Sequence, residues 1–216
     1  MKSPTILLTG FEAFGGEALN PSWLVAEALH GKKVAGLRIQ AHRLPCVFGQ
    51  SLHSLAGALS KAQPRLVLLL GQAGGRSDLS LERVAVNVDD ARIPDNLGQQ
   101  PIDEAVVPGA PAAYFSSLPI KAMVAALHNA GLPASVSQTA GTFVCNHVFF
   151  GLMHALQQQG GVRGGFMHLP YLPAQATHRP GQASMPLATM LEGVHLALLT
   201  AVQVASDVRL TGGTEA

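Results

Sequence analysis

Short apolar runs alternate along this chain with longer stretches in which apolar residues recur at helical spacing. The run at 65–71 is continuously apolar, as a central parallel strand is, and a similar run at 5–9 predicts a buried first strand. Strand patterns also cover 34–44, 81–88, 134–138 and 164–169. Helical patterns cover 21–29, 48–62, 119–130, 145–158 and 185–204. This alternation predicts an α/β fold with helices on both faces of a sheet.

The domain organisation follows from the same pattern. No internal repeat or linker interrupts the 216 residues, which suffice for one large domain. We therefore expect a single-domain three-layer α/β/α sandwich with a mostly parallel twisted sheet, and an active site beyond the carboxyl ends of its strands. The segment 89–117 is rich in Pro, Gly, Asp and Asn and lacks periodicity, which favours a functional or subunit-contacting excursion.

Composition narrows the classes of function. Charged residues make up only 12% of the chain and hydrophobic residues 48%, which excludes general disorder and favours self-association as a homo-oligomer. The 14 basic and 13 acidic residues leave no field that would attract nucleic acid or a membrane surface. The N-terminal apolar stretch is too short for a signal peptide and two cysteines make no disulfide framework, so we expect a cytoplasmic protein.

One cysteine stands where an extended segment gives way to a helix, in the sequence GTFVCNH at 141–147. The partial positive charge of a helix N-terminus favours the thiolate, which is the nucleophilic form of cysteine. Cys145 is therefore the candidate nucleophile for covalent catalysis. A small buried hydrophobe with no chemical role is the alternative interpretation.

A thiol nucleophile needs a general base. Of the nine histidines, His168 stands out because it ends an apolar strand, with two glycines at 164–165 behind it and Pro170 ahead. That position fixes an imidazole at the carboxyl edge of the sheet, where the geometry of a base matters. A core histidine with satisfied hydrogen bonds is the alternative.

The base in turn needs a group that orients it. Glu82 is the candidate because it lies within a strand pattern, and carboxylates are rare in buried strands unless they are paired. An ion pair of Glu82 with Arg76 or Arg83 on an edge strand is the structural alternative. The other candidates for the orienting acid are three aspartates in the following loop, namely Asp89, Asp90 and Asp95.

Other chemistries have weaker signals. The glycine-rich loops at 10–16 and 71–75 match neither GxGxxG nor a Walker pattern, and tight turns beside an active site explain them. The pair Cys145-x-His147 has no second cluster at ligand spacing. We therefore expect no metal and no cofactor.

Several blocks of the sequence together resemble the pyrrolidone carboxyl peptidases, also called pyroglutamyl peptidases I, a family of cytoplasmic cysteine peptidases. The blocks are GFEAFGG at 10–16 with NPSW at 20–23, GQAGGR at 71–76 running through ERVAVN at 82–87, DARIPDN at 90–96, GTFVCN at 141–146 and GFMHLPY at 165–171. The resemblance covers nearly the whole chain and implies one peptidase domain over 1–210. Residues 211–216 lie outside it and are expected to form a disordered tail.

The resemblance implies a Cys-His-Glu triad on Cys145, His168 and Glu82. It also implies hydrolysis of the amide bond after the N-terminal pyroglutamyl residue of small peptides through a thioester, with no metal and commonly as a tetramer. The backbone amide of Cys145 is then the natural oxyanion donor, assisted by Arg92.

Pyroglutamate is a small neutral lactam, so a peptidase of this kind needs apolar walls and a few polar contacts. The expected walls are Phe11, Phe14, Phe143, Ile93 and Val144. Gln72 and the backbone near it are expected to hydrogen-bond the lactam edge, and Asn20 to fix either the loop at 11–14 or the substrate. In such a site proline leaves polar groups unpaired and is rejected. Cys46 either lines the pocket or is inert.

Three other functions remain open at this point. One is a thiol amidase of another cyclic or acylated amino acid, and one is a non-catalytic lactam-binding relative. The third is an enzyme like the nucleoside phosphorylases, since doubly wound sheets serve many chemistries. That last function needs a phosphate-binding site with Arg or Ser at a glycine turn, and Arg76 is the only candidate residue for it in the sequence.

Overall fold

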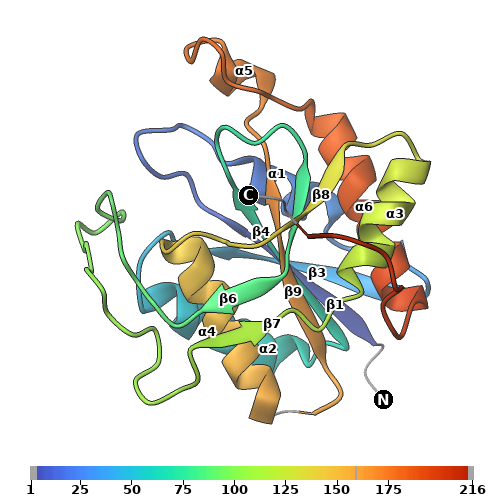
Figure 1. Cartoon of the computed structure of the whole chain (residues 1–216), viewed down its shortest axis with the longest axis horizontal. Helices are drawn as coiled ribbons and strands as arrows, with labels where there is room; N and C mark the ends of the chain where they lie inside the picture. The colour runs from blue at the N-terminus through green and yellow to red at the C-terminus, as the bar shows by residue number, and fades with distance from the viewer. Residues whose placement is uncertain (1–3, 159, 214–216) are drawn as a thin grey trace.

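The computed structural model describes residues 4–158 and 160–213, in which strands and helices alternate (Figure 1). The strands are β1 (Thr5–Phe11), β2 (Lys33–Val34), β3 (Leu37–Leu44), β4 (Leu66–Gln72), β5 (Leu79–Glu82), β6 (Val84–Val86), β7 (Ala113–Phe115), β8 (Ala134–Ser137) and β9 (Arg163–Leu169). The helices are α1 (Pro21–Leu29), α2 (Gln50–Ala62), α3 (Ile120–Asn129), α4 (Val144–Gln158), α5 (Pro173–Ala176) and α6 (Leu187–Gln203). Within these ranges, no helix combines the length and apolar character needed to cross a membrane.

A seven-stranded sheet forms the centre of the molecule, in the order β2-β3-β1-β4-β9-β5-β8. Four pairs of neighbours are parallel, namely β3–β1, β1–β4, β4–β9 and β5–β8. The pairs β2–β3 and β5–β9 are antiparallel. The expected mostly parallel sheet is thus confirmed, with an antiparallel step beside β9.

Helices cover both faces of this sheet, which confirms the three layers. On β4, Leu68 and Leu70 belong to the core under α1, α3 and α6, whereas Val67 and Leu69 belong to the core under α2 and α4. The two sets alternate because successive side chains of a strand point to opposite faces. We call these sides the α1 face and the α4 face. In Figure 1, α2 and α4 lie on one side of the strands and α1, α3 and α6 on the other.

The strand pattern predicted over 81–88 is divided between two sheets. β5 ends at Glu82 in the central sheet, and β6 pairs antiparallel with β7 in a separate two-stranded sheet that packs on α4. Arg83 lies between β5 and β6. Its backbone N–H donates a hydrogen bond to the carbonyl of Ser137, and its carbonyl accepts one from the backbone N–H of Ser116. The continuous strand is therefore wrong, and the break leaves Glu82 at the end of a central strand.

The segment after β6 is the expected excursion, and it runs along the outside of α4 before it returns as β7 (Figure 1). At the other end of the chain, the carbonyl of Gly212 accepts hydrogen bonds from Arg83 at 2.5 Å and Gln138 at 3.1 Å. The tail expected over 211–216 is therefore held at Gly212. Residues 214–216 lie outside the described residues.

Candidate active site

Three strand ends place functional residues on the α4 face of the sheet. In the pairing of β4 with β9, Gly71 lies beside His168. In the antiparallel pairing of β5 with β9, Glu82 lies opposite Phe166 and Ser80 opposite His168. Glu82 and His168 are therefore diagonal neighbours on one face of the sheet. Phe166 packs in the core under α2 and α4, which identifies that face.

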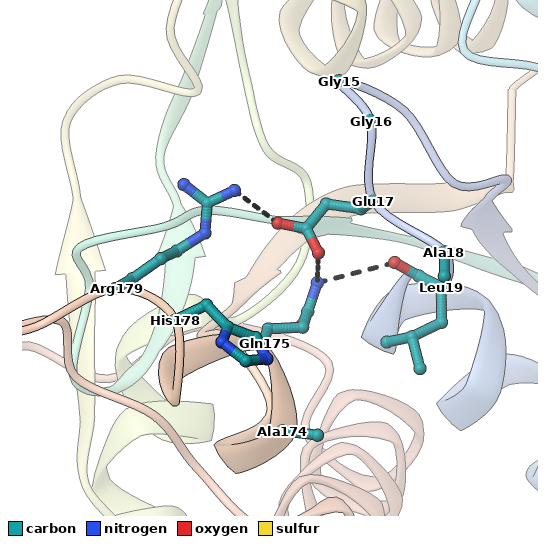
Figure 2. Close-up of a pocket in the computed structure, with 9 residues that line it drawn as sticks. All are labelled: Gly15, Gly16, Glu17, Ala18, Leu19, Ala174, Gln175, His178 and Arg179. Carbon is teal, nitrogen blue, oxygen red and sulfur yellow. Dashed lines mark hydrogen bonds and ion pairs between the residues drawn. The ribbon is translucent and has the colours of Figure 1, made fainter.

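The α1 face of the same edge carries a cavity of about 510 Å³ between the loop after β1 and α5 (Figure 2). The carboxylate of Glu17 points from this loop toward α5 and accepts hydrogen bonds from Arg179 at 2.5 Å and Gln175 at 3.2 Å. Gln175 also donates to the side-chain carbonyl of Gln72 at 2.9 Å. Gln72 follows Gly71 on β4, so its side chain points away from the α4 face and its backbone is what borders that face.

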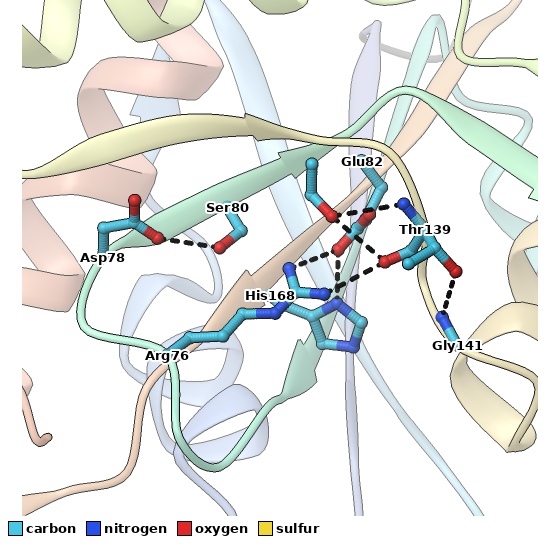
Figure 3. Close-up of polar contacts among 8 residues, drawn as sticks. Arg76, Asp78, Ser80, Glu82, Thr139, Gly141 and His168 are labelled. Carbon is cyan, nitrogen blue, oxygen red and sulfur yellow. Dashed lines mark hydrogen bonds and ion pairs between the residues drawn. The ribbon is translucent and has the colours of Figure 1, made fainter. Parts of the chain in front are cut away.

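On the α4 face, a buried carboxylate joins the histidine to an arginine (Figure 3). Oε1 of Glu82 accepts hydrogen bonds from Nδ1 of His168 at 2.7 Å and from Nη1 of Arg76 at 2.6 Å. Because a carboxylate only accepts, Nδ1 of His168 carries the proton and Nε2 is free to accept another. Burial lowers the pKa of His168 below its ordinary 6.5, although the bond to Glu82 acts in the opposite direction. The ring is therefore a neutral base at pH 7.

Cys145 lies in the first turn of α4 with its sulfur against Gly71. A Cβ added at Gly71 would come within 2.9 Å of that sulfur and 2.6 Å of the Phe166 ring, so this position requires glycine. Since Gly71 is also the strand neighbour of His168, the thiol and the imidazole lie on the same face of the sheet. Adjacent strands are about 4.8 Å apart.

The ionisation of Cys145 differs from the sequence-based expectation. Burial, and after it the charge of Glu82, raise the pKa of the thiol to about 12, while Arg76 acts in the opposite direction. The resting group is therefore a thiol. The partial charge of the α4 N-terminus was expected to favour the thiolate, but the loss of solvent around the sulfur outweighs it.

The start of α4 is tied to the segment that follows β6. Buried Asn146 accepts a hydrogen bond from the N–H of Val86 at 3.0 Å and donates to the carbonyls of Val86 and Val88 at 2.9 and 3.0 Å. The hydroxyl of Thr142 donates to the carbonyl of Asp90 at 2.7 Å. These bonds fix the backbone on both sides of Cys145 and connect it to the chain that leaves Glu82.

The structure separates Glu82 from its rivals as the orienting acid. Asp89 accepts a hydrogen bond at 2.7 Å from Nδ1 of His147, whose Nε2 accepts from the N–H of Gly49 at 3.0 Å. Asp95 accepts from the backbone N–H of Phe48 at 2.9 Å. Both aspartates therefore hold loops around α4, and the carboxylate bonded to His168 belongs to Glu82.

Aromatic rings pack around Phe143, two residues before the candidate nucleophile Cys145. Phe143 packs edge-on against Phe48 at a centroid distance of 5.4 Å and in a tilted arrangement against Phe14 at 6.1 Å. Phe11 and Val144 are buried in the cluster on which these rings pack. Four of the expected wall residues are thus gathered on the α4 face, next to Cys145.

The other expected contact residues are placed differently. Asn20 caps α1: its Oδ1 accepts from the N–H and hydroxyl of Ser22 at 3.0 and 2.7 Å, and its Nδ2 donates to the carbonyl of Glu12 at 3.0 Å. Of its two expected roles, this geometry supports fixing the loop after β1. Arg92 and Ile93 lie exposed on the excursion.

Cys46 is buried in the same apolar cluster as Phe11 and Val144, and its N–H donates to Oε1 of Glu12 at 3.0 Å. Burial, and after it the neighbouring Cys145, Glu12 and Asp95, raise the pKa of its thiol. Within the described ranges, no group of three or more His, Cys, Asp or Glu residues is arranged to hold a metal ion.

Sequence reasoning missed two residues of this site. Phe48 lies inside the helix predicted over 48–62, but α2 begins at Gln50 after Gly49, whose φ of 68° ends the preceding loop. Phe48 is therefore free to pack on Phe143. Asn146 carried one signal that could have identified it, since a polar amide directly after Cys145 sits in an otherwise apolar helical pattern.

Comparisons with known proteins identify the family. The family model described as "Pyroglutamyl peptidase" matches residues 4–204. The chain is 60% identical to the pyrrolidone-carboxylate peptidase of Klebsiella pneumoniae strain 342, over 96% of this chain and 97% of that one, and 57% identical to that of Cupriavidus necator, over 97% and 98%. The crystal structure of pyroglutamyl peptidase I from Bacillus amyloliquefaciens superposes with a TM-score of 0.94 at 43% identity, over 97% of this chain and all of that one. The chain therefore belongs to the pyroglutamyl peptidase family.

Proposed function

We propose that this protein is a cysteine peptidase that hydrolyses the amide bond after an N-terminal pyroglutamyl residue, with Cys145 as nucleophile, His168 as base and Glu82 as the acid that orients His168. The observation that carries the proposal is the single face on which these groups meet. Glu82 bonds to Nδ1 of His168, and the sulfur of Cys145 lies against Gly71, the strand neighbour of His168. Small peptides with N-terminal pyroglutamate are the substrates.

The resting protonation states set the first step. Because the thiol and the imidazole are both neutral, Nε2 of His168 takes the proton of Cys145 while the sulfur attacks the acyl carbon of pyroglutamate. The imidazolium formed is stabilised by its hydrogen bond to the carboxylate of Glu82. His168 then gives its proton to the leaving amine as the C–N bond breaks, and a thioester remains.

The second half repeats this transfer with water. Nε2 of His168 takes a proton from water as the oxygen attacks the thioester carbon. The C–S bond breaks, the sulfur regains a proton from His168, and pyroglutamate leaves. The negative oxygen of each tetrahedral intermediate is stabilised by backbone N–H groups at the start of α4, which have no acceptor within the helix. Arg92 is the side chain proposed to assist.

Specificity rests on the rings and the strand-end backbone beside Cys145. Phe14 and Phe143, on the cluster that contains Phe11 and Val144, hold the apolar part of the lactam, with Ile93 closing the pocket from the excursion. The backbone of Gln72 hydrogen-bonds the lactam edge. A substrate without the lactam carbonyl leaves such groups unpaired, which disfavours a prolyl residue by several orders of magnitude.

One assay tests this function. Release of a fluorescent amine is measured from a pyroglutamyl amide and from the matching prolyl amide, with the wild type and Cys145→Ser. We expect turnover of the pyroglutamyl amide by the wild type alone. No turnover by the wild type would overturn the proposal, and equal turnover of the prolyl amide would indicate a different thiol amidase.

We further propose that the protein is a cytoplasmic homo-oligomer, a tetramer by analogy with the family. The excursion supports self-association because it exposes large apolar side chains, including Leu97 at 62% and Ile102 at 70%, and Phe115 on β7 is exposed to 70%. Light scattering measures the mass directly, and a monomer at micromolar concentration would contradict the assembly.

A further inference from the structure

Arg76 has two contacts that the proposed mechanism does not use. Nη1 bonds to Oε1 of Glu82 at 2.6 Å, and Nη2 donates to the carbonyl of Thr139 at 3.0 Å. Figure 3 shows the guanidinium group between these two partners, next to His168. Arg76 thus joins the acid of the triad to the segment that leads into Cys145.

The charge of Arg76 compensates a carboxylate that has no access to water. Glu82 is 0% exposed, and its Oε2 has no hydrogen-bond partner among the described residues. Its other partner, His168, is neutral at rest. An isolated buried carboxylate is strongly destabilised, and a bonded guanidinium offsets much of that cost. Without Arg76, no bonded cation balances the charge of Glu82, and the carboxylate loses one of the two contacts that fix it against His168.

The second contact acts on the nucleophile's own segment. The carbonyl of Thr139 also accepts from the hydroxyl of Ser137 at 3.0 Å, and the hydroxyl of Thr139 accepts from the N–H of Gly141 at 3.0 Å. Gly141 has a φ of 78°, so the chain turns there toward Cys145. A guanidinium bonded to this carbonyl restrains the turn from the side of Glu82.

Arg76 itself is held by a close approach of two loops. Arg76 lies two residues after Gly74, where an added Cβ would lie 2.2 Å from the ring of Tyr171. The backbone N–H of Arg76 donates a hydrogen bond to the carbonyl of Ala73. Tyr171 lies three residues after His168. The loop that carries Arg76 is therefore packed on the segment that follows the base, which leaves Arg76 27% exposed in its side chain but fixed at its backbone.

We propose that Arg76 is a positioning residue of this peptidase: it compensates the buried charge of Glu82, so that Glu82 orients His168, and it fixes the turn before Cys145. The proposal rests on the proposed function. The charge of Arg76 also acts on the thiol, whose pKa it lowers against the effects of burial and of Glu82. The charged groups that act on the thiol are Glu82 on β5 and Arg76 after β4. His168 on β9 lies on the same face, and the thiol of Cys46 after β3 is coupled to that of Cys145.

The test compares Arg76→Gln and Arg76→Lys with the control Arg179→Gln, which removes the Arg179–Glu17 ion pair on the other face of the sheet edge. Two quantities are measured: kcat and KM for the pyroglutamyl amide, and the rate at which iodoacetamide alkylates Cys145 between about pH 6 and 10 without substrate, in a Cys46→Ser background. The alkylation rate does not depend on the identity of the substrate.

For Arg76→Gln we expect kcat to fall at least about 10-fold with KM changed less than about 2-fold, because positioning acts on the chemical step. We expect the alkylation rate at fixed pH to fall at least about 3-fold, because less of the thiol is ionised. Arg76→Lys keeps the charge but cannot span both partners, so it should restore alkylation and leave kcat reduced. Arg179→Gln should leave both unchanged.

Kinetics of Arg76→Gln that match Arg179→Gln would overturn the proposal, as would a loss confined to KM. If Arg76→Gln does not fold, Arg76→Lys tests the proposal alone. An unchanged kcat in that variant would show that the simultaneous contact with Glu82 and Thr139 is not needed, and would overturn the proposal. A wild type that alkylates as expected but does not cleave the pyroglutamyl amide contradicts the proposed function and leaves the role of Arg76 in the ionisation of Cys145 measurable.

Discussion

Nδ1 of His168 donates a 2.7 Å hydrogen bond to Oε1 of Glu82, although 86 positions separate the two residues in sequence. The bond exists because β5 runs antiparallel to β9, with Glu82 opposite Phe166 and Ser80 opposite His168. A shift of the register by one residue would turn Glu82 to the other face of the sheet. The orientation of the base therefore depends on the pairing of these two strands.

Glu82→Gln tests this relationship. The amide group introduced can donate to Nδ1, which favours the tautomer with the proton on Nε2 and leaves no base for Cys145. We expect kcat to fall by roughly 10³–10⁴-fold, with thermal unfolding little changed. The pyroglutamyl amide assay measures the first and calorimetry the second. An unchanged rate would exclude Glu82 and redirect attention to Asp90 and Asp95.

The pH dependence of kcat/KM reports the pKa of the general base in the free enzyme. His168 must be neutral to accept the thiol proton, so activity rises with pH through the pKa of His168 in the free enzyme. Burial lowers that pKa, so we expect the midpoint of the acid limb below 6.5. Rates between about pH 4.5 and 8.5, with a check that the protein stays folded, give the midpoint. A midpoint at or above 6.5 would contradict a buried neutral imidazole.

Gly71→Ala tests whether the close packing of the Cys145 sulfur on Gly71 requires glycine. The added methyl group would overlap the Phe166 ring and the sulfur of Cys145, at 2.6 and 2.9 Å. We expect kcat to fall about 10-fold or more and the free energy of unfolding to drop by about 1–3 kcal/mol. Denaturant unfolding and the amide assay measure the two effects.

Gly57→Ala is the matched control for this substitution. Gly57 lies within α2, and an added Cβ meets no atom within 4 Å. Alanine there should leave activity unchanged and stabilise the protein by about 0.5–1 kcal/mol. Equal behaviour of the two variants would mean that Gly71 has no special role.

Cys46→Ser separates the two thiols. Cys46 is 3% exposed in an apolar cluster, and burial raises its pKa, so we expect no catalytic part for it. The variant should retain most of its activity and lose about 1–2 kcal/mol of stability, because a hydroxyl replaces a thiol among apolar groups. Mass spectrometry after inhibition by iodoacetamide should find the label on Cys145. Loss of activity on a folded protein would reopen which thiol attacks.

Periodicity alone was sufficient for most of the architecture. The apolar run at 65–71 predicts β4, and the helical pattern before Pro64 predicts α2, because burial on a sheet or one helix face repeats at a fixed spacing in sequence. The position of Cys145 at a helix start and of His168 at a strand end is likewise local information. The family blocks in the sequence imply a triad of Cys145, His168 and Glu82.

The way these parts act together depends on how distant segments pack in the folded chain. Periodicity does not report the direction in which β5 pairs, so the contact of Glu82 with His168 and Arg76 depends on the assembled sheet. The helix start suggests a thiolate at Cys145, but burial within the folded layers, and after it the charge of Glu82, raise the pKa of the thiol to about 12. Local sequence determines which group stands at a position. Its ionisation depends on the dielectric and the charges that distant segments bring to it, and these exist only once the chain has folded.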